Sequence, residues 1–117
     1  MSVDYCDKVY PGTHLPTMEN LAEIATILYE TEIDTPKSLS FSPDTPSGNK
    51  AIQAYQQNIN TIRSALGITS SSPFYLWSNN SYSDTRAYSF ALFPTRTSLE
   101  GGSYNSNGVP LAVCVGD

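Results

Sequence analysis

Basic residues are scarce in this chain, and they are never clustered. Only 6 of the 117 residues are Lys or Arg, against 11 Asp and Glu, which gives a net charge of −5. The two closest basic residues, Arg86 and Arg96, are ten positions apart. Nucleic acids and anionic membrane surfaces both attract proteins through clustered positive charge. We therefore expect no nucleic-acid partner and no binding to an anionic membrane.

Long apolar runs are also missing. The longest, Phe74–Trp77 and Ala87–Phe93, are far shorter than the roughly 20 residues of a membrane-spanning helix. The N-terminus, Met1–Asp4, lacks the basic start and the hydrophobic run of a signal peptide. The sequence predicts no direct membrane insertion, and it leaves open whether the natural chain extends upstream.

The residues that are present indicate one folded domain. Hydrophobic residues make up 39% and charged residues 15% of the chain, which is too apolar for a disordered segment. A length of 117 residues suits a single core, so residues 1–117 are expected to form one domain. Ser, Thr and Asn are abundant, and the 8 tyrosines offer contact area together with a hydroxyl. Such surfaces are typical of secreted recognition modules.

Cysteine is limited to Cys6 and Cys114, near the two ends of the chain. Two unlinked buried thiols would require no particular compartment. A bridge is favoured because the pair is the whole set and each cysteine lies in an apolar-flanked segment that suits a strand. Closing so long a loop would stabilise the fold by up to about 4–5 kcal/mol. A disulfide would place the chain in an oxidising compartment, and the absence of a CxxC motif makes the pair structural.

Two amphipathic helices are predicted. The first follows Leu15–Thr17, in which the proline holds the chain extended and the threonine can cap the helix, and it ends near Tyr29. The second runs from about Asn49 to Leu66, and Gly67 suits a left-handed cap after it. The apolar stripes of these helices consist of Leu21, Ile24, Ala25 and Leu28, and of Ile52, Tyr55, Ile59, Ile62 and Leu66.

The remaining segments are expected to form strands and loops. The predicted strands are Tyr5–Val9, Phe74–Trp77, Thr85–Phe93 and Val109–Val115, and the predicted turns are Ser78–Ser81 and Gly101–Gly102. A loop rich in proline and serine spans residues 31–48. The resulting order is β-α-α-β-β-β. This order predicts an α+β fold in which two helices pack on a small antiparallel sheet, and a Cys6–Cys114 disulfide joins the terminal strands.

Three short motifs, taken in order, carry a resemblance to a known superfamily. They are Leu15–Thr17 before the first helix, Tyr75–Ser78 in the first strand after the second helix, and the closing Leu111–Val115. With these motifs the chain resembles a C-type lectin-like domain, and in particular the C-terminal domain of intimin/invasin-family bacterial adhesins. The resemblance extends from Cys6 to Val115.

The resemblance implies an extracellular module at the bacterial cell surface, or a secreted one, that acts in cell adhesion and virulence. It would be the C-terminal domain of a longer surface or secreted protein. Its partner would be a protein receptor on a host cell, and no cofactor is expected. The Glu-Pro-Asn and Gln-Pro-Asp triplets of calcium-dependent lectins are absent, and Asp84 is the only carboxylate near the Trp77 loop. Calcium requires about 6–8 oxygen ligands, so calcium-independent binding is expected.

Catalysis finds little support in the residues. His14 is the only histidine, and pairing it with Ser89 and Asp7 would lack any nucleophile motif. We expect a non-enzymatic protein with no catalytic residues and no metal site. Glu19 and Glu23 share one helical face opposite the apolar stripe, where they are expected to be solvated.

The binding surface is expected in the loops at 78–86 and 94–108. The predicted binding residues are Trp77, Tyr82, Arg86, Arg96 and Tyr104. Trp77 has two interpretations, a core residue between the second helix and the sheet, or an anchor in an interface. Two other partners are left open. One is a bacterial outer-membrane protein, and the other is a glycan bound on stacked aromatic rings without calcium.

Overall fold

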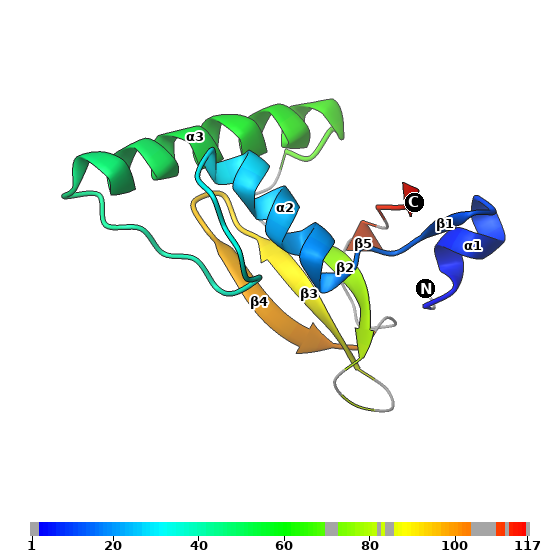
Figure 1. Cartoon of the computed structure of the whole chain (residues 1–117). Helices are drawn as coiled ribbons and strands as arrows, with labels where there is room; N and C mark the ends of the chain where they lie inside the picture. The colour runs from blue at the N-terminus through cyan, green and yellow to red at the C-terminus, as the bar shows by residue number, and fades with distance from the viewer. Residues whose placement is uncertain are drawn as a thin grey trace.

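The computed structural model describes residues 3–69, 73–81, 83, 86–103, 110–111 and 113–116, and within these ranges the chain forms three helices and six strands. Figure 1 shows the two long helices, α2 (Met18–Tyr29) and α3 (Pro46–Ala65), on one face of the main sheet, which has four strands. Both chain ends lie on the same side of the molecule, near α1 (Tyr5–Val9) and β1 (Thr13–His14). The predicted α+β class is therefore confirmed.

The first element is a helix, and the strand predicted at the same residues is wrong. α1 spans Tyr5–Val9, and the Lys8 Nζ lies 3.2 Å from the Asp4 Oδ2 one helical turn away. The prediction failed because five residues are too few to distinguish the period of a strand from that of a helix. The first strand, β1 (Thr13–His14), comes later and pairs antiparallel with β6 (Val115–Gly116).

The predicted disulfide between Cys6 and Cys114 is present. The two Cα atoms are 5.4 Å apart, although the residues are 108 positions apart in the sequence. Cys6 belongs to α1 and is fully buried, while Cys114 directly precedes β6. The bridge therefore holds α1 beside the β1–β6 pair and links the two ends of the chain.

The second helix, α2 (Met18–Tyr29), begins and ends where the sequence predicts. The Thr17 Oγ1 accepts a hydrogen bond from the Asn20 N–H at 3.0 Å, and the Asn20 Oδ1 accepts one from the Thr17 N–H at 2.9 Å. This reciprocal cap satisfies amides that a helix start leaves unpaired. The predicted apolar face is also confirmed, because Leu21 and Ala25 are fully buried.

The third helix, α3 (Pro46–Ala65), begins three residues before the predicted start at Asn49. The Thr45 Oγ1 accepts a hydrogen bond from the Gly48 N–H at 3.0 Å and caps the helix. Its first residue is a proline, which the first turn tolerates because the amide there has no helical partner. α3 is the longest helix, and no helix within the described ranges is long and apolar enough to cross a membrane.

The end of α3 differs from the prediction at one residue. Leu66, expected to complete the apolar stripe, lies just beyond the helix and is 48% exposed. Gly67 has a φ of +70°, the left-handed conformation expected of the cap. The Ile68 N–H then donates to the Arg63 carbonyl at 2.8 Å, and the Ile68 side chain packs against the core.

The main sheet has the strand order β4-β3-β2-β5. β2 (Phe74–Ser81), β3 (Ala87–Leu92) and β4 (Thr97–Gly102) pair antiparallel, whereas β5 (Pro110–Leu111) pairs with β2 in parallel. The expected antiparallel pairing is therefore present in three strands, and β5 adds one parallel pair that the sequence did not predict. The proline starts an edge strand, where a missing amide hydrogen is tolerated.

Three predictions for the second half of the chain are wrong. Ser78–Ser81 continues β2 and does not form a turn. Gly101–Gly102 ends β4, a strand at residues that were assigned to a loop. The single last strand predicted at Val109–Val115 is replaced by β5 and β6, which belong to different sheets. Polar and glycine-rich strands lack the apolar alternation that marks a strand in a sequence, so pairing with neighbours decides their structure.

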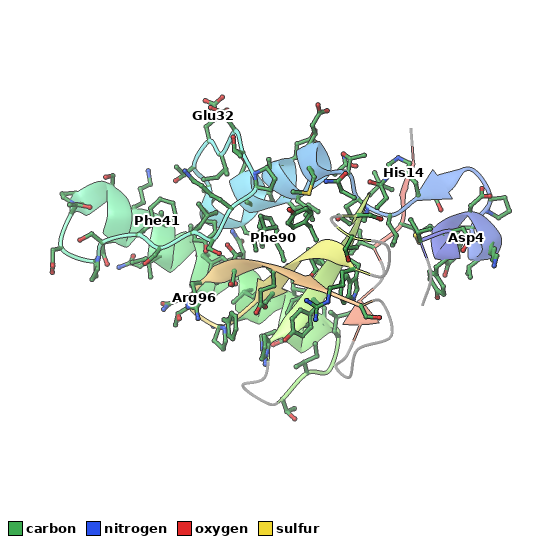
Figure 2. The ribbon with its side chains drawn as sticks, turned by 90° about the horizontal axis from the view of Figure 1, so that it is seen from below. Asp4, His14, Glu32, Phe41, Phe90 and Arg96 are labelled. Atoms are coloured by element: carbon green, nitrogen blue, oxygen red, sulfur yellow. A yellow bond between two sulfur atoms is a disulfide. The ribbon has the colours of Figure 1, made fainter. Side chains whose placement is uncertain are left out.

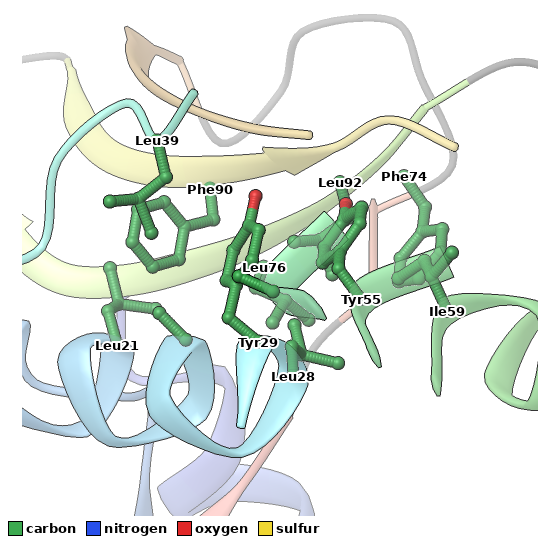
Figure 3. Packing of buried hydrophobic residues seen from close by; sticks show 12 residues of the cluster. Leu21, Leu28, Tyr29, Leu39, Tyr55, Ile59, Phe74, Leu76, Phe90 and Leu92 are labelled. Atoms are coloured by element: carbon green, nitrogen blue, oxygen red, sulfur yellow. The ribbon is translucent and has the colours of Figure 1, made fainter. Parts of the chain in front are cut away.

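The core lies between the two long helices and one face of the main sheet (Figure 3). The rings of Tyr29 and Tyr55 stack there, with centroids 4.6 Å apart. The Tyr55 hydroxyl donates to the carbonyls of Phe93 and Arg96, at 2.6 and 2.8 Å, and the Thr97 N–H donates to the Tyr29 hydroxyl at 2.9 Å. Burial raises the pKa of both tyrosines. These hydrogen bonds attach the helices to the β3–β4 turn.

Candidate binding surface

The two faces of the main sheet carry different side chains. Alternation along β2 directs Phe74 and Leu76 toward the helices, where both belong to the core. Tyr75 and Trp77 consequently point to the opposite side, which we call the outer face. Across the sheet, Trp77 is in register with Ser89, and Ser89 is in register with Glu100. The outer face therefore brings aromatic, hydroxyl and carboxylate groups together.

A hollow of about 350 Å³ lies on the outer face. We call it the outer-face hollow, and it is lined by Tyr75, Trp77, Arg86, Ser89, Glu100, Gly101, Gly102 and Ser103. β2, β3 and β4 all contribute to it. Its size is at the small end of ligand pockets, which suits a single side chain of a partner better than a large ligand.

Trp77 is buried, but not between the second helix and the sheet. The residue is only 4% exposed, which agrees with the interpretation of Trp77 as a core residue. Its ring nevertheless lies on the outer face, so a position between the second helix and the sheet is wrong. The reason is the strand period of two, which directs Leu76 and not Trp77 toward the helices. The Trp77 ring lies 6.5 Å from the Tyr75 ring, with 28° between their planes.

Opposite charges border the outer-face hollow. Arg86 precedes β3 and Glu100 lies within β4, and both residues are exposed. Gly101 and Gly102 have no side chains, so only their backbone lines the β4 side of the hollow. The hollow thus offers a cation, a carboxylate and aromatic walls within one small volume.

Arg96, another predicted binding residue, lies at the other end of the main sheet. Because β3 and β4 are antiparallel neighbours, the turn that holds Arg96 is a full strand length away from Arg86. The Arg96 guanidinium carbon lies 4.5 Å from the centroid of the Phe93 ring. Figure 2 shows Arg96 on the side of the molecule away from Asp4 and α1. The structure therefore groups Arg86 with Trp77 and separates Arg96 from them.

The remaining two predicted binding residues, Tyr82 and Tyr104, lie outside the described residues. Of the predicted contact loops, residues 78–81 belong to β2 and residues 97–102 to β4. Residue 86 and residue 103 flank the paired ends of β3 and β4. Residues 86 and 103, one from each predicted loop, therefore lie at the same end of the sheet.

An acidic hollow of about 480 Å³ lies between α2 and the loop that follows it. Glu19, Glu23, Glu32 and Asp34 line it, and all four are exposed, as expected for Glu19 and Glu23. Figure 2 shows Glu32 projecting from the molecular edge. In the described parts of the chain, no group of three or more His, Cys, Asp and Glu residues could hold a metal ion.

The geometry adds no support for a catalytic triad. His14 belongs to the small β1–β6 sheet, and its Nδ1 lies 2.7 Å from the Leu15 carbonyl oxygen, to which the N–H form donates. Ser89 belongs to β3 of the main sheet. The two residues that a serine nucleophile and its base would require are thus placed on different sheets.

Several residues of the outer-face hollow were not predicted from the sequence. Tyr75 shares a face with Trp77, and the alternation in Phe74–Trp77 could have identified it. Glu100 was missed because Gly101–Gly102 suggested a turn. The alternation of Thr97 and Leu99 with more polar neighbours is the signal that could have revealed β4.

Comparison with known proteins gave no match for this chain. No protein-family model matches it, and neither a curated protein nor a solved structure is significantly similar to it.

Proposed function

We propose that this chain is an extracellular domain that binds a protein receptor through the outer-face hollow, without calcium. The observation that supports the proposal is the hollow itself, which combines the aromatic walls of Tyr75 and Trp77 with the charges of Arg86 and Glu100. Aromatic residues and arginine contribute most of the binding energy in protein interfaces. Supporting the walls on three paired strands keeps them rigid, which lowers the entropic cost of binding.

The disulfide supports the extracellular part of the proposal. Cys6 and Cys114 account for all the cysteine in the chain, and they are joined. Stable disulfides are common in secreted and surface proteins and rare in the cytosol. An anchored adhesin and a released protein both satisfy this requirement.

The C-type lectin-like assignment is part of the same proposal. Its support is the order of elements, in which two helices precede the main sheet, and the disulfide that links the chain ends. On this basis the chain would be the terminal domain of a bacterial surface adhesin of the intimin/invasin type, acting on a host cell.

A protein receptor fits the hollow better than a glycan does. Sugars bind to aromatic rings whose faces are open to solvent, and Trp77 is only 4% exposed. The Trp77 ring therefore forms a wall of the hollow and not a platform. A partner side chain that enters the hollow can contact such a wall and pair with Arg86 or Glu100 at the rim.

Binding of the labelled domain to intact epithelial cells, measured by flow cytometry, tests the proposal. We expect Arg86→Ala to lower the apparent affinity at least tenfold, because it removes a charge at the hollow. Arg96→Ala should change it less than threefold, since Arg96 lies at the other end of the sheet. Lys50→Ala on α3 is the neutral control.

Further comparisons complete the test. EDTA should leave binding unchanged, and trypsin treatment of the cells should abolish it. Equal losses for Arg86→Ala and Arg96→Ala would refute the outer-face hollow as the contact site. Binding that survives trypsin but disappears after glycosidase treatment would replace the protein receptor with a glycan. Binding to purified bacterial envelopes and not to host cells would move the partner to the bacterial outer membrane.

A further inference from the structure

β4 forms one edge of the main sheet, and among the described residues contacts of the backbone edge are found only along its first half. The Leu39 N–H donates to the Thr97 carbonyl at 3.2 Å, and the Leu99 N–H donates to the Ser38 Oγ at 3.0 Å. These bonds show that the backbone groups of Thr97 and Leu99 point away from β3. Figure 1 shows the loop that carries Ser38 and Leu39 passing close to β4.

Strand geometry extends this pattern to Gly101. In an antiparallel pair, the backbone groups of alternate residues point toward the partner strand and away from it. Gly101 is two residues beyond Leu99, so its N–H and its carbonyl point off the edge, as does the carbonyl of Leu99. Gly101 is exposed, and in the described ranges the isolated bridge at Leu39 is the only pairing on this side of β4. The second half of β4 is thus an available edge.

The open edge lies beside the outer-face hollow. Glu100 and Gly101 line the hollow, and Glu100 points to the outer face. A strand added to β4 would place every second side chain on that face, with one of them next to the Glu100 carboxylate. Gly101 presents no side chain that would obstruct such a strand.

We propose that an extended segment of the receptor adds to β4 as a further strand and places a basic side chain beside Glu100. This inference rests on the proposed function and specifies how the partner is recognised. Backbone hydrogen bonds to Gly101 and to the Leu99 carbonyl hold the segment. The stem of the Lys or Arg lies along the aromatic walls, and its charge pairs with the carboxylate.

A second copy of this chain is a poor candidate for the added strand. Edge-to-edge pairing of two β4 strands would bring two Glu100 carboxylates onto the same face of the joined sheet. Each chain also carries a net charge of −5, which opposes self-association at low salt. Charge complementarity therefore favours a basic partner segment over a second copy.

A phage-displayed library of random linear 12-residue peptides, panned on the folded domain, provides the probe. We expect the enriched peptides to alternate β-branched residues and to share one Lys or Arg. The best peptide, synthesised, should bind Gly101→Pro at least tenfold more weakly, because proline removes the N–H that points off the edge. Lys50→Ala on α3, which belongs to neither the edge nor the hollow, is the control and should bind within threefold of the parent domain.

A charge swap keeps the inference falsifiable if Gly101→Pro fails to fold. Glu100→Lys should weaken the basic peptide at least tenfold, and the same peptide with Glu in place of its basic residue should recover binding to Glu100→Lys. Peptides that bind Gly101→Pro and Glu100→Lys as well as the parent domain would overturn the inference. So would an enriched set without a shared basic residue, an empty selection, or a concentration-dependent dimer through β4.

Cell binding of the same variants distinguishes a failure of the strand-addition inference from a failure of the proposed function. If cell binding is lost in Arg86→Ala but fully retained in a folded Gly101→Pro domain, the hollow is the contact site and strand addition is wrong. If Gly101→Pro and Arg86→Ala both retain cell binding, the hollow itself is not the contact site.

Discussion

The two faces of the main sheet differ in how tightly they are packed and in how far their polar groups are exposed. On the helix-covered face, Phe90 and Leu92 are buried, and the buried tyrosine hydroxyls bond to backbone groups of the β3–β4 region. On the outer face, a buried Trp77 borders a hollow whose charged residues, Arg86 and Glu100, remain exposed. Because the helix-covered face is filled by buried side chains and the outer face carries exposed charged residues beside a hollow, we assign stability to the first and recognition to the second.

Deleting a side chain from the helix-covered face should have the largest effect. Phe90 is completely buried within the core cluster (Figure 3). Phe90→Ala removes most of its ring volume and is expected to lower the free energy of unfolding by about 3–5 kcal/mol. Urea denaturation followed by circular dichroism measures this loss. A loss below about 1 kcal/mol would mean that the face is less tightly packed than described.

Removing the disulfide should weaken both faces together, since the bridge belongs to neither. The double variant Cys6→Ala/Cys114→Ala is expected to lose about 2–5 kcal/mol, because the unfolded chain regains the freedom of a loop closed over 108 positions. Unfolding should remain a single transition with a lower midpoint. Two separate transitions in calorimetry would contradict this expectation, and the parent domain in reducing agent is the matched control.

Alkaline pH should weaken the helix-covered face selectively. Burial raises the pKa of Tyr29 and Tyr55 above the ordinary value near 10. Between pH 10 and the raised folded pKa, the folded state keeps protons that the unfolded chain loses. Stability is therefore complete below pH 10 and falls above it, by at most about 1.4 kcal/mol per pH unit for each tyrosine. Urea titrations at several pH values measure the slope, and Tyr55→Phe should make it shallower.

Neutralising a charge on the outer face should affect stability least. Glu100 is exposed, and in the part of the chain that the structure describes its carboxylate forms no ion pair. Glu100→Gln is expected to change the free energy of unfolding by less than about 0.5 kcal/mol. The same variant should bind the receptor more weakly. A stability loss comparable with that of Phe90→Ala would remove the distinction between the two faces.

The parts of the fold that were predictable carry their signal within a short stretch of sequence. α2 was located by its capping threonine, Thr17, and by apolar residues at helical spacing. The disulfide followed from there being only two cysteines. α1 could not be distinguished from a strand, because five residues do not define a period. β4 was not predicted from the sequence, because its glycines also suit a turn.

The candidate site was less predictable than the fold for a related reason. Trp77 and Arg86 were selected by residue type alone. Their grouping with Glu100 depends on the register of three strands, in which Trp77 faces Ser89 and Ser89 faces Glu100. Register is set by pairing across the sheet and has no local sequence signature. For the same reason, the sequence could not show that Arg96 lies at the other end of the sheet.

The central claim is that the domain binds its receptor through the outer face. Blocking each side of the domain in turn tests this claim most directly. A single cysteine carrying a 5-kDa polyethylene glycol would be placed at Glu100 on the outer face or at Glu23 on α2, with the Cys6–Cys114 bridge verified by mass spectrometry. The account predicts that Glu100→Cys-PEG abolishes binding to receptor-bearing cells and that Glu23→Cys-PEG leaves it nearly unchanged. The reverse pattern, or equal loss from both positions, would contradict recognition through the outer face.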